Sequence, residues 1–107
     1  MSYIYLASPY SSPEPFVQEE RYLKACRATH YLLAQKIWVF SPIVHCHELA
    51  KMVDLPKDAT FWKDYNFAML AGASKLIILR IEGWEASAGV RAERAEADRL
   101  EIPFEYL

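Results

Sequence analysis

The chain has 107 residues, of which 53% are hydrophobic and 24% charged, and its formal net charge at pH 7 is −2. This length fits a single domain with one hydrophobic core, and the composition excludes an intrinsically disordered chain. Because there is no excess of positive charge, we expect no binding to nucleic acid.

The apolar runs and the cysteines indicate the cellular compartment of the protein. The longest apolar runs, such as residues 76–79, are far too short to cross a bilayer, so we expect no membrane association. The first residues lack the basic stretch and the long apolar segment of a signal peptide. The 2 cysteines cannot form a disulfide framework. We therefore expect a reduced, cytoplasmic protein.

Short apolar strands alternate with amphipathic helices along the chain. We predict strands at residues 3–7, 37–40, 75–81 and 102–106, the last at a sheet edge because Pro103 lacks an amide proton. We predict helices at residues 14–35, 45–52, 60–73 and 87–100, and a loop at residues 55–58. In the first helix, three- and four-residue spacing predicts an apolar face that comprises Phe16, Leu23, Cys26, His30 and Leu33.

This alternation predicts an α/β fold with an open, mostly parallel sheet of about four to five strands and helices on both faces. In such sheets, ligands bind outside the carboxyl ends of the strands. The loops that follow the first three strands lie at residues 8–13, 41–47 and 82–89. We therefore expect the binding site to be formed by these three loops.

The third loop and the helix after it carry the most informative residues. Ser87 begins the helix, where free backbone amides and a partial positive charge suit a phosphate or carboxylate, although a simple helix cap also explains this serine. Gly89 would let a ligand approach the backbone closely. Glu93 shares a stripe with Val90 and Ala97 that should face the sheet. Burying a carboxylate there is costly unless the group has a function.

The first loop follows Tyr5, whose hydroxyl could reach the crevice or could belong to an ordinary core tyrosine. The hydroxyl groups of Ser8, Tyr10 and Ser11 suit a sugar or a phosphate, but they also suit a turn.

Histidines and aromatic residues supply further candidates in the second loop and the third helix. His45 and His47 are two positions apart, so they cannot share one helix face, and no second Cys/His cluster exists. We therefore predict no metal site and expect both histidines to line or cap a pocket. Trp62 and Tyr65 could sandwich a nucleobase, although a core helix with a polar face would show the same pattern.

Four segments together resemble one protein family. They are YLASPY at residues 5–10, FSPIVH at 40–45, FW with YN at 61–66, and GWExSxGVxxE at 83–93. The family is a small bacterial and phage family of unassigned function, related to the nucleoside 2-deoxyribosyltransferases and the 2'-deoxynucleoside 5'-phosphate N-hydrolases. The resemblance covers nearly the whole chain as one domain. It implies a flavodoxin- or Rossmann-like sheet, no cofactor, and a homo-oligomer, either a homodimer or a dimer of dimers.

The resemblance also implies roles for individual residues. Glu93 stands at the position of the relatives' nucleophile, and Tyr5 matches the tyrosine that contacts this glutamate or the sugar. Ser87 and Gly89 match the segment that holds a 5'-phosphate, and Ser8 with its neighbours matches a loop that helps to hold it. Trp84 belongs to the same motif as Ser87, and we include it among the substrate-binding candidates.

Asn66 is a departure from the relatives, which carry an aspartate at the matching position. Asparagine can hydrogen-bond a sugar hydroxyl but cannot act as a general acid, a role that His45 or His47 could fill. The resemblance implies an N-glycosidase or deoxyribosyltransferase that cleaves the base–sugar bond of a nucleoside, deoxynucleoside or 5'-monophosphate through a glutamate nucleophile. A non-catalytic nucleotide-binding or sensing module of the same fold, and a purely structural protein, are the alternatives.

Overall fold

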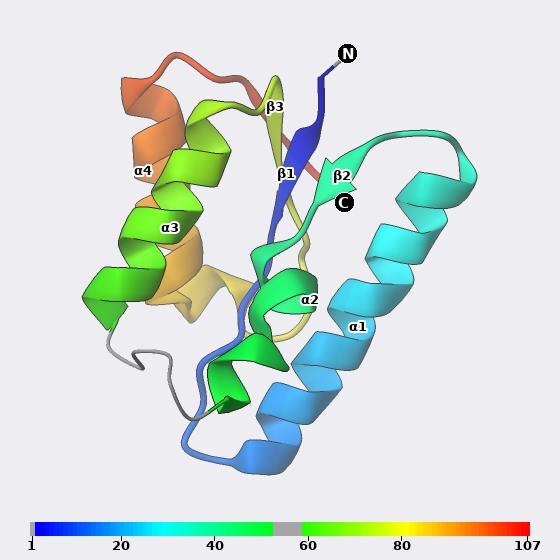
Figure 1. The fold of residues 1–107 in the computed structure, drawn as a ribbon, viewed down its shortest axis with the longest axis vertical. Coiled ribbons are helices and arrows are strands. Elements are labelled where there is room, and N and C mark those ends of the chain that lie inside the picture. The colour runs from blue at the N-terminus through cyan, green and yellow to red at the C-terminus, as the bar shows by residue number, and fades with distance from the viewer. Residues whose placement is uncertain (1, 53–58) are drawn as a thin grey trace.

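The computed structural model describes residues 2–52 and 59–107, so the loop predicted at residues 55–58 lies outside the described residues (Figure 1). Four strands are present in the described ranges: β1 (Ile4–Ala7), β2 (Val39–Phe40), β3 (Lys75–Ile78) and β4 (Phe104–Tyr106). They alternate with the helices α1 (Pro15–Ala34), α2 (Pro42–Cys46), α3 (Ala59–Ala71) and α4 (Ala88–Arg99). Two short 3-10 turns, η1 (Leu49–Lys51) and η2 (Trp84–Ala86), complete the elements described.

The four strands form one sheet in the order β2-β1-β3-β4, and every neighbouring pair is parallel. The prediction of an open α/β sheet of the Rossmann- or flavodoxin-like kind is therefore confirmed. Because the chain moves from β1 to one side for β2 and to the other side for β3, the strand order reverses next to β1. In such sheets a crevice for ligands opens at this reversal, outside the carboxyl ends of the strands.

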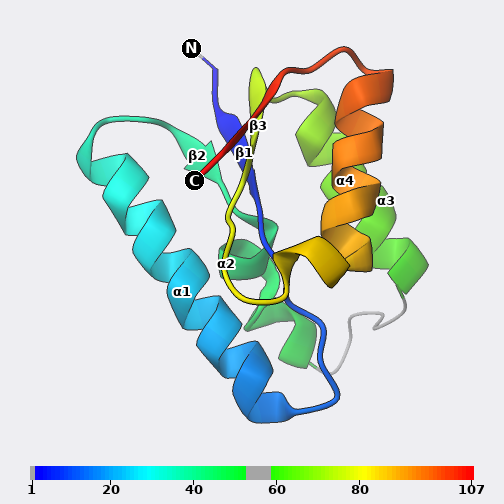
Figure 2. The same cartoon turned by 180° about the vertical axis from the view of Figure 1, so that it is seen from behind.

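Helices cover both faces of the sheet, as predicted. Figures 1 and 2 show α1 on one face and α3 with α4 on the other. Alternate residues of each strand supply the two cores, since successive side chains point to opposite faces. Tyr5 and Leu76 pack in the core under α3 and α4, whereas Leu6 and Ile77 pack with Leu32 of α1.

The apolar face predicted for α1 is wrong in part. Phe16, Leu23 and Leu33 are 66%, 48% and 45% exposed, and the buried residues of the helix are Ala25 and Leu32. With 20 residues α1 is about 30 Å long, whereas the four-residue strands β1 and β3 span about 13 Å. Only part of the helix can therefore lie over the sheet. Neither α1 nor any other described helix is both long enough and apolar enough to cross a membrane.

The helix predicted at residues 45–52 begins earlier and is divided. The Ser41 side chain accepts a hydrogen bond of 3.2 Å from the Val44 amide, which caps α2 at its amino end. Pro42 fits the first turn of a helix, because amides in this turn have no intrahelical acceptor and proline has no amide proton. After α2, the chain forms only the short turn η1.

Candidate active site

A cavity of about 820 Å³ lies at the carboxyl ends of the strands, within the range of known small-molecule sites. The loops after β1 and β3 contribute to its wall, together with α2, α3 and the first turns of α4. It has the position that the strand alternation predicts. The candidate residues in its lining are Ser8, Tyr10, Ser11, His47, Trp62, Asn66, Ser87, Gly89 and Glu93.

Glu93 lies in the wall of this cavity on the inner face of α4, where Val90, Glu93 and Ala97 are all buried, as the stripe predicts. Its Oε2 accepts a hydrogen bond from the hydroxyl of Tyr5 in β1. Burial raises the pKa of Glu93 to about 7, and the Tyr5 hydrogen bond opposes this rise. A carboxyl group in this state can change between acid and carboxylate near neutral pH.

Tyr5 supports Glu93 from the core and does not itself line the cavity. Its side chain is fully buried, and burial followed by the nearby Glu93 charge raises the pKa of Tyr5 well above its ordinary value. The hydroxyl therefore keeps its proton and remains a donor to Glu93. The contact fixes the orientation of the carboxyl group.

The amino end of α4 forms another part of the wall. Ser87 caps this 12-residue helix, because its Oγ accepts a hydrogen bond of 3.2 Å from the Val90 amide. The amides of Ala88 and Gly89 belong to the first turn, which lacks intrahelical acceptors and carries a partial positive charge. A Cβ atom built on Gly89 would meet only Ser87 Oγ, at 3.8 Å. This part of the wall therefore has room for an anionic group.

Two polar atoms in the lining have no hydrogen-bond partner among the described residues. They are Ser8 Oγ in the first loop and Asn66 Oδ1 in α3, and both atoms are buried. Leaving a buried polar group without a partner costs about 1–3 kcal/mol. A hydroxyl or amine group of a ligand could donate a hydrogen bond to Asn66 Oδ1. The Ser8 hydroxyl could donate a hydrogen bond to a ligand or accept one from it.

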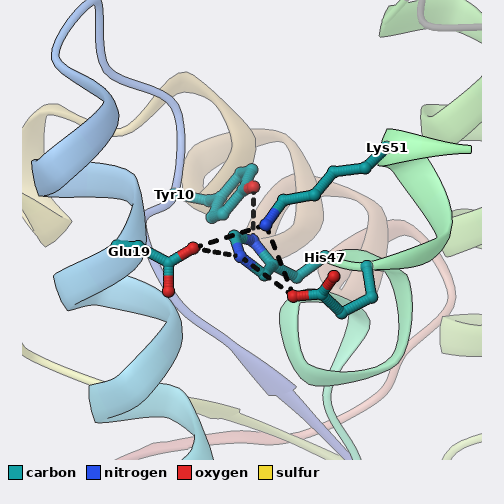
Figure 3. A network of polar contacts seen from close by, with 5 residues as sticks. Tyr10, Glu19, His47 and Lys51 are labelled. Carbon is teal, nitrogen blue, oxygen red and sulfur yellow. Dashed lines mark hydrogen bonds and ion pairs between the residues drawn. The ribbon is translucent and has the colours of Figure 1, made fainter.

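A chain of polar contacts also reaches the cavity from its α1 side, as Figure 3 shows. The Tyr10 hydroxyl lies 2.6 Å from His47 Nδ1, and His47 Nε2 lies 2.8 Å from Glu19 Oε1. His47 is 4% exposed, and its ring stacks on Tyr22 with ring centroids 4.0 Å apart. Lys51 Nζ lies 3.5 Å from the same Glu19 oxygen.

Sequence reasoning missed Glu19, Lys51 and Arg21, which also lines the cavity. Glu19 and His47 are 28 positions apart, and they meet only because α1 packs against α2. No local pattern signals such a contact. The available hint was the position of Glu19 and Arg21 in the first turns after the loop that carries Ser8, Tyr10 and Ser11.

The other candidates lie outside the cavity lining. The exposed His45 ring stacks on Tyr65, at 6.1 Å between centroids and 3° between planes. Trp62 meets Tyr65 nearly edge-on, at 6.1 Å and 74°, so the two rings do not form a parallel clamp for a base. Trp84 packs against the core and contacts the Tyr106 ring. Within residues 2–52 and 59–107, no three His, Cys, Asp or Glu side chains come together to hold a metal.

Comparison with known proteins places the chain in a family. No curated protein matches it. One family model, described as Domain of unknown function (DUF1937), matches residues 2–105 and thus spans every residue of the cavity lining. The chain therefore belongs to the DUF1937 family.

Proposed function

We propose that this protein is an N-glycosidase or deoxyribosyltransferase that cleaves the base–sugar bond of a deoxynucleoside or its 5'-monophosphate. The observation that carries the proposal is the buried Glu93, held by Tyr5 in the wall of a nucleotide-sized cavity next to the start of α4. The resemblance of residues 83–93 to a family related to the nucleoside 2-deoxyribosyltransferases and the 2'-deoxynucleoside 5'-phosphate N-hydrolases supports the same assignment.

In the first step, a carboxylate oxygen of Glu93 attacks the anomeric carbon of the sugar. The new carbon–oxygen bond replaces the carbon–nitrogen bond, whose electron pair leaves with the base, and the base takes up a proton. The transition state resembles an oxocarbenium ion, and the product is a glycosyl ester of Glu93. Tyr5 holds the attacking oxygen in position, as its hydrogen bond in the free protein indicates.

In the second step, a water molecule attacks the same carbon, breaks the ester and restores the Glu93 carboxylate, while its proton passes to a nearby base. If a second nucleobase attacks in place of water, the reaction is a transfer. Both routes retain the configuration at the anomeric carbon, because two inversions occur.

The amino end of α4 is the proposed site of the 5'-phosphate. The Ala88 and Gly89 amides and the Ser87 hydroxyl can donate hydrogen bonds to phosphate oxygens there. Arg21, whose Nη1 donates to the Ser11 carbonyl at 2.8 Å, adds positive charge to the lining. Binding energy from the phosphate would then orient the sugar toward Glu93.

A second function, nucleotide binding without catalysis, is favoured by one observation. Asn66 stands where the relatives carry an aspartate, and its free Oδ1 can accept a sugar or base hydrogen bond but cannot deliver a proton. Such a module would bind a deoxynucleotide tightly and release no base.

A base-release assay separates the two functions. The protein is incubated with the deoxynucleosides, their 5'-monophosphates and ribonucleotide controls, and free base is measured by chromatography. We expect release by the natural protein, loss of at least about 10³-fold in Glu93→Gln, and no loss in Asp98→Asn, which removes an exposed carboxylate from the same helix. Binding of a deoxynucleotide without release would favour the sensing module, and equal release by Glu93→Gln would refute the proposed role of Glu93.

A further inference from the structure

The leaving base needs a proton, and three of the candidate residues, Asn66, Tyr5 and His45, do not supply one. Asn66 cannot act as an acid, and the Tyr5 hydroxyl is fully buried and bonded to Glu93. His45 is exposed and lies outside the cavity lining. Tyr10 and His47 do line the cavity and carry exchangeable protons.

We infer that Tyr10 is the proton donor to the leaving base, and that His47 and Glu19 form the relay that supplies its proton. This inference rests on the proposed function, since it assigns the acid of the same reaction. Tyr10 would be a catalytic residue, whereas His47 and Glu19 act through it and are positioning residues.

The contacts of His47 determine where its protons lie. The Glu19 carboxylate can only accept, so His47 Nε2 must donate to it across 2.8 Å. The hydrogen bond from His47 is also the main reason why the pKa of Glu19 is lowered. In neutral His47, Nδ1 therefore accepts a hydrogen bond from the Tyr10 hydroxyl. In protonated His47, Nδ1 donates to the Tyr10 oxygen and leaves the tyrosine proton free to point elsewhere.

These two states balance the proton transfers of both steps. When the base leaves, the Tyr10 proton moves to the base nitrogen and the Nδ1 proton of His47 moves to the Tyr10 oxygen, which leaves His47 neutral. When water attacks the glycosyl ester, its proton moves to the Tyr10 oxygen and the Tyr10 proton returns to His47 Nδ1. The relay is thus acid in the first step and base in the second, as glycoside hydrolysis requires.

The placement of the groups suits a displacement reaction. Glu93 belongs to α4 on one face of the sheet, while His47 is bound to Glu19 of α1 on the other face (Figures 1 and 3). Tyr10 and Glu93 line the same cavity. A sugar bound between them can receive the nucleophile from the α4 side and the proton donor from the α1 side.

The charged and titratable groups around His47 come from three parts of the chain. Glu19 and Tyr22 belong to α1, Tyr10 to the loop after β1, and Glu48 and Lys51 to the segment after α2. Glu48 Oε1 lies 3.9 Å from His47 Nε2, and Lys51 Nζ lies 3.3 Å from that same Glu48 oxygen. Two carboxylate groups and the Lys51 ammonium group therefore lie close to His47.

The test compares two leaving groups in Tyr10→Phe, His47→Gln and Glu19→Gln. One substrate set is the deoxynucleoside 5'-monophosphates, whose bases need a proton, and the other is a 2-deoxyribosyl 5-phosphate donor with a 4-nitrophenolate leaving group, which needs none. We expect Tyr10→Phe and His47→Gln to lose about 10²- to 10³-fold in kcat on the nucleotides and less than about tenfold on the nitrophenyl donor. Glu19→Gln should show the same selectivity with a smaller loss, and Tyr31→Phe, an exposed tyrosine of α1, should show no loss.

The difference between the two leaving groups is a readout that a merely structural role would not change, because a general loss of structure slows the cleavage of both substrates alike. Equal losses on both leaving groups, or no loss in Tyr10→Phe, would overturn the relay while leaving Glu93 catalysis intact. A natural protein that cleaves neither substrate would overturn the proposed function and the relay together.

Discussion

The carboxyl group of Glu93 links folding to pH. Its pKa rises from 4.5 to about 7 on burial, so between these values the folded protein keeps a proton that the unfolded chain releases. The contribution of Glu93 to the free energy of unfolding should therefore be largest below pH 4.5, fall as the pH rises, and level off above about 7. The difference corresponds to about 3 kcal/mol.

Urea unfolding over this pH range measures the effect. Glu93→Gln carries a neutral side chain of the same size, so it should lack this decline, whereas Asp98→Asn should keep it. The same slope in Glu93→Gln as in the natural protein would show that another group causes the pH dependence.

Tyr5→Phe tests the partner of Glu93. The Tyr5 hydrogen bond lowers the pKa of Glu93, so removing it should raise that pKa and move the acid side of the rate profile to higher pH. We also expect kcat/KM to fall by about 10- to 100-fold, since a hydrogen bond to a charged group contributes about 1.5–3 kcal/mol. Rate measurements across pH would speak against this role if the acid side kept its position in Tyr5→Phe.

The amino end of α4 has a helix cap and the proposed phosphate site, and serine variants can distinguish the two roles. Ser87 and Ser41 each cap a helix through a 3.2 Å hydrogen bond to the amide three residues on, but only Ser87 lines the cavity. Each change to alanine should cost about 1 kcal/mol of stability. Only Ser87→Ala should also weaken binding of a deoxynucleoside 5'-monophosphate, by about tenfold, relative to the unphosphorylated nucleoside.

Thermal unfolding and binding titrations give the two readouts. If Ser41→Ala weakened nucleotide binding as much as Ser87→Ala does, the effect would come from the loss of a helix cap in general. Unchanged binding in Ser87→Ala would exclude its hydroxyl from the phosphate site.

At the level of elements, local patterns predict the positions of the described strands, although β2 and β3 are shorter than the predicted strands at residues 37–40 and 75–81. The predicted helices at residues 14–35, 60–73 and 87–100 agree with α1, α3 and α4 to within two residues at each end. The exposed face of α1 could not be predicted, because it depends on how far the helix extends beyond a short sheet. The start of α2 was missed because Ser41 and Pro42 can end a strand as well as begin a helix.

Local patterns predict part of the candidate site, but they do not predict its long-range contacts. Residues that directly follow strands, such as Ser8 and Ser87, were found because parallel strands bring their carboxyl ends together. Glu93 was found from its helical stripe. The contact between Glu19 and His47 required the packing of α1 on α2, which no sequence period encodes.

For the whole molecule, we expect a homo-oligomer, a homodimer or a dimer of dimers. The described strands β2 and β4 are at the edges of the sheet, and α1 exposes apolar side chains such as Phe16 and Leu23. Open edges and exposed apolar surface favour association. Sedimentation equilibrium should therefore give the mass of two or four chains, and the mass of one chain at all concentrations would contradict this expectation.

The covalent intermediate on Glu93 provides the most direct test of the proposed function. The protein is mixed with its best deoxynucleotide, quenched in acid within the first turnovers, and analysed by intact-mass and peptide mass spectrometry. We expect a deoxyribosyl phosphate adduct on the peptide that contains Glu93, and no adduct in Glu93→Gln. Base release without any adduct, or an adduct that persists in Glu93→Gln, would contradict the assignment of Glu93 as the nucleophile.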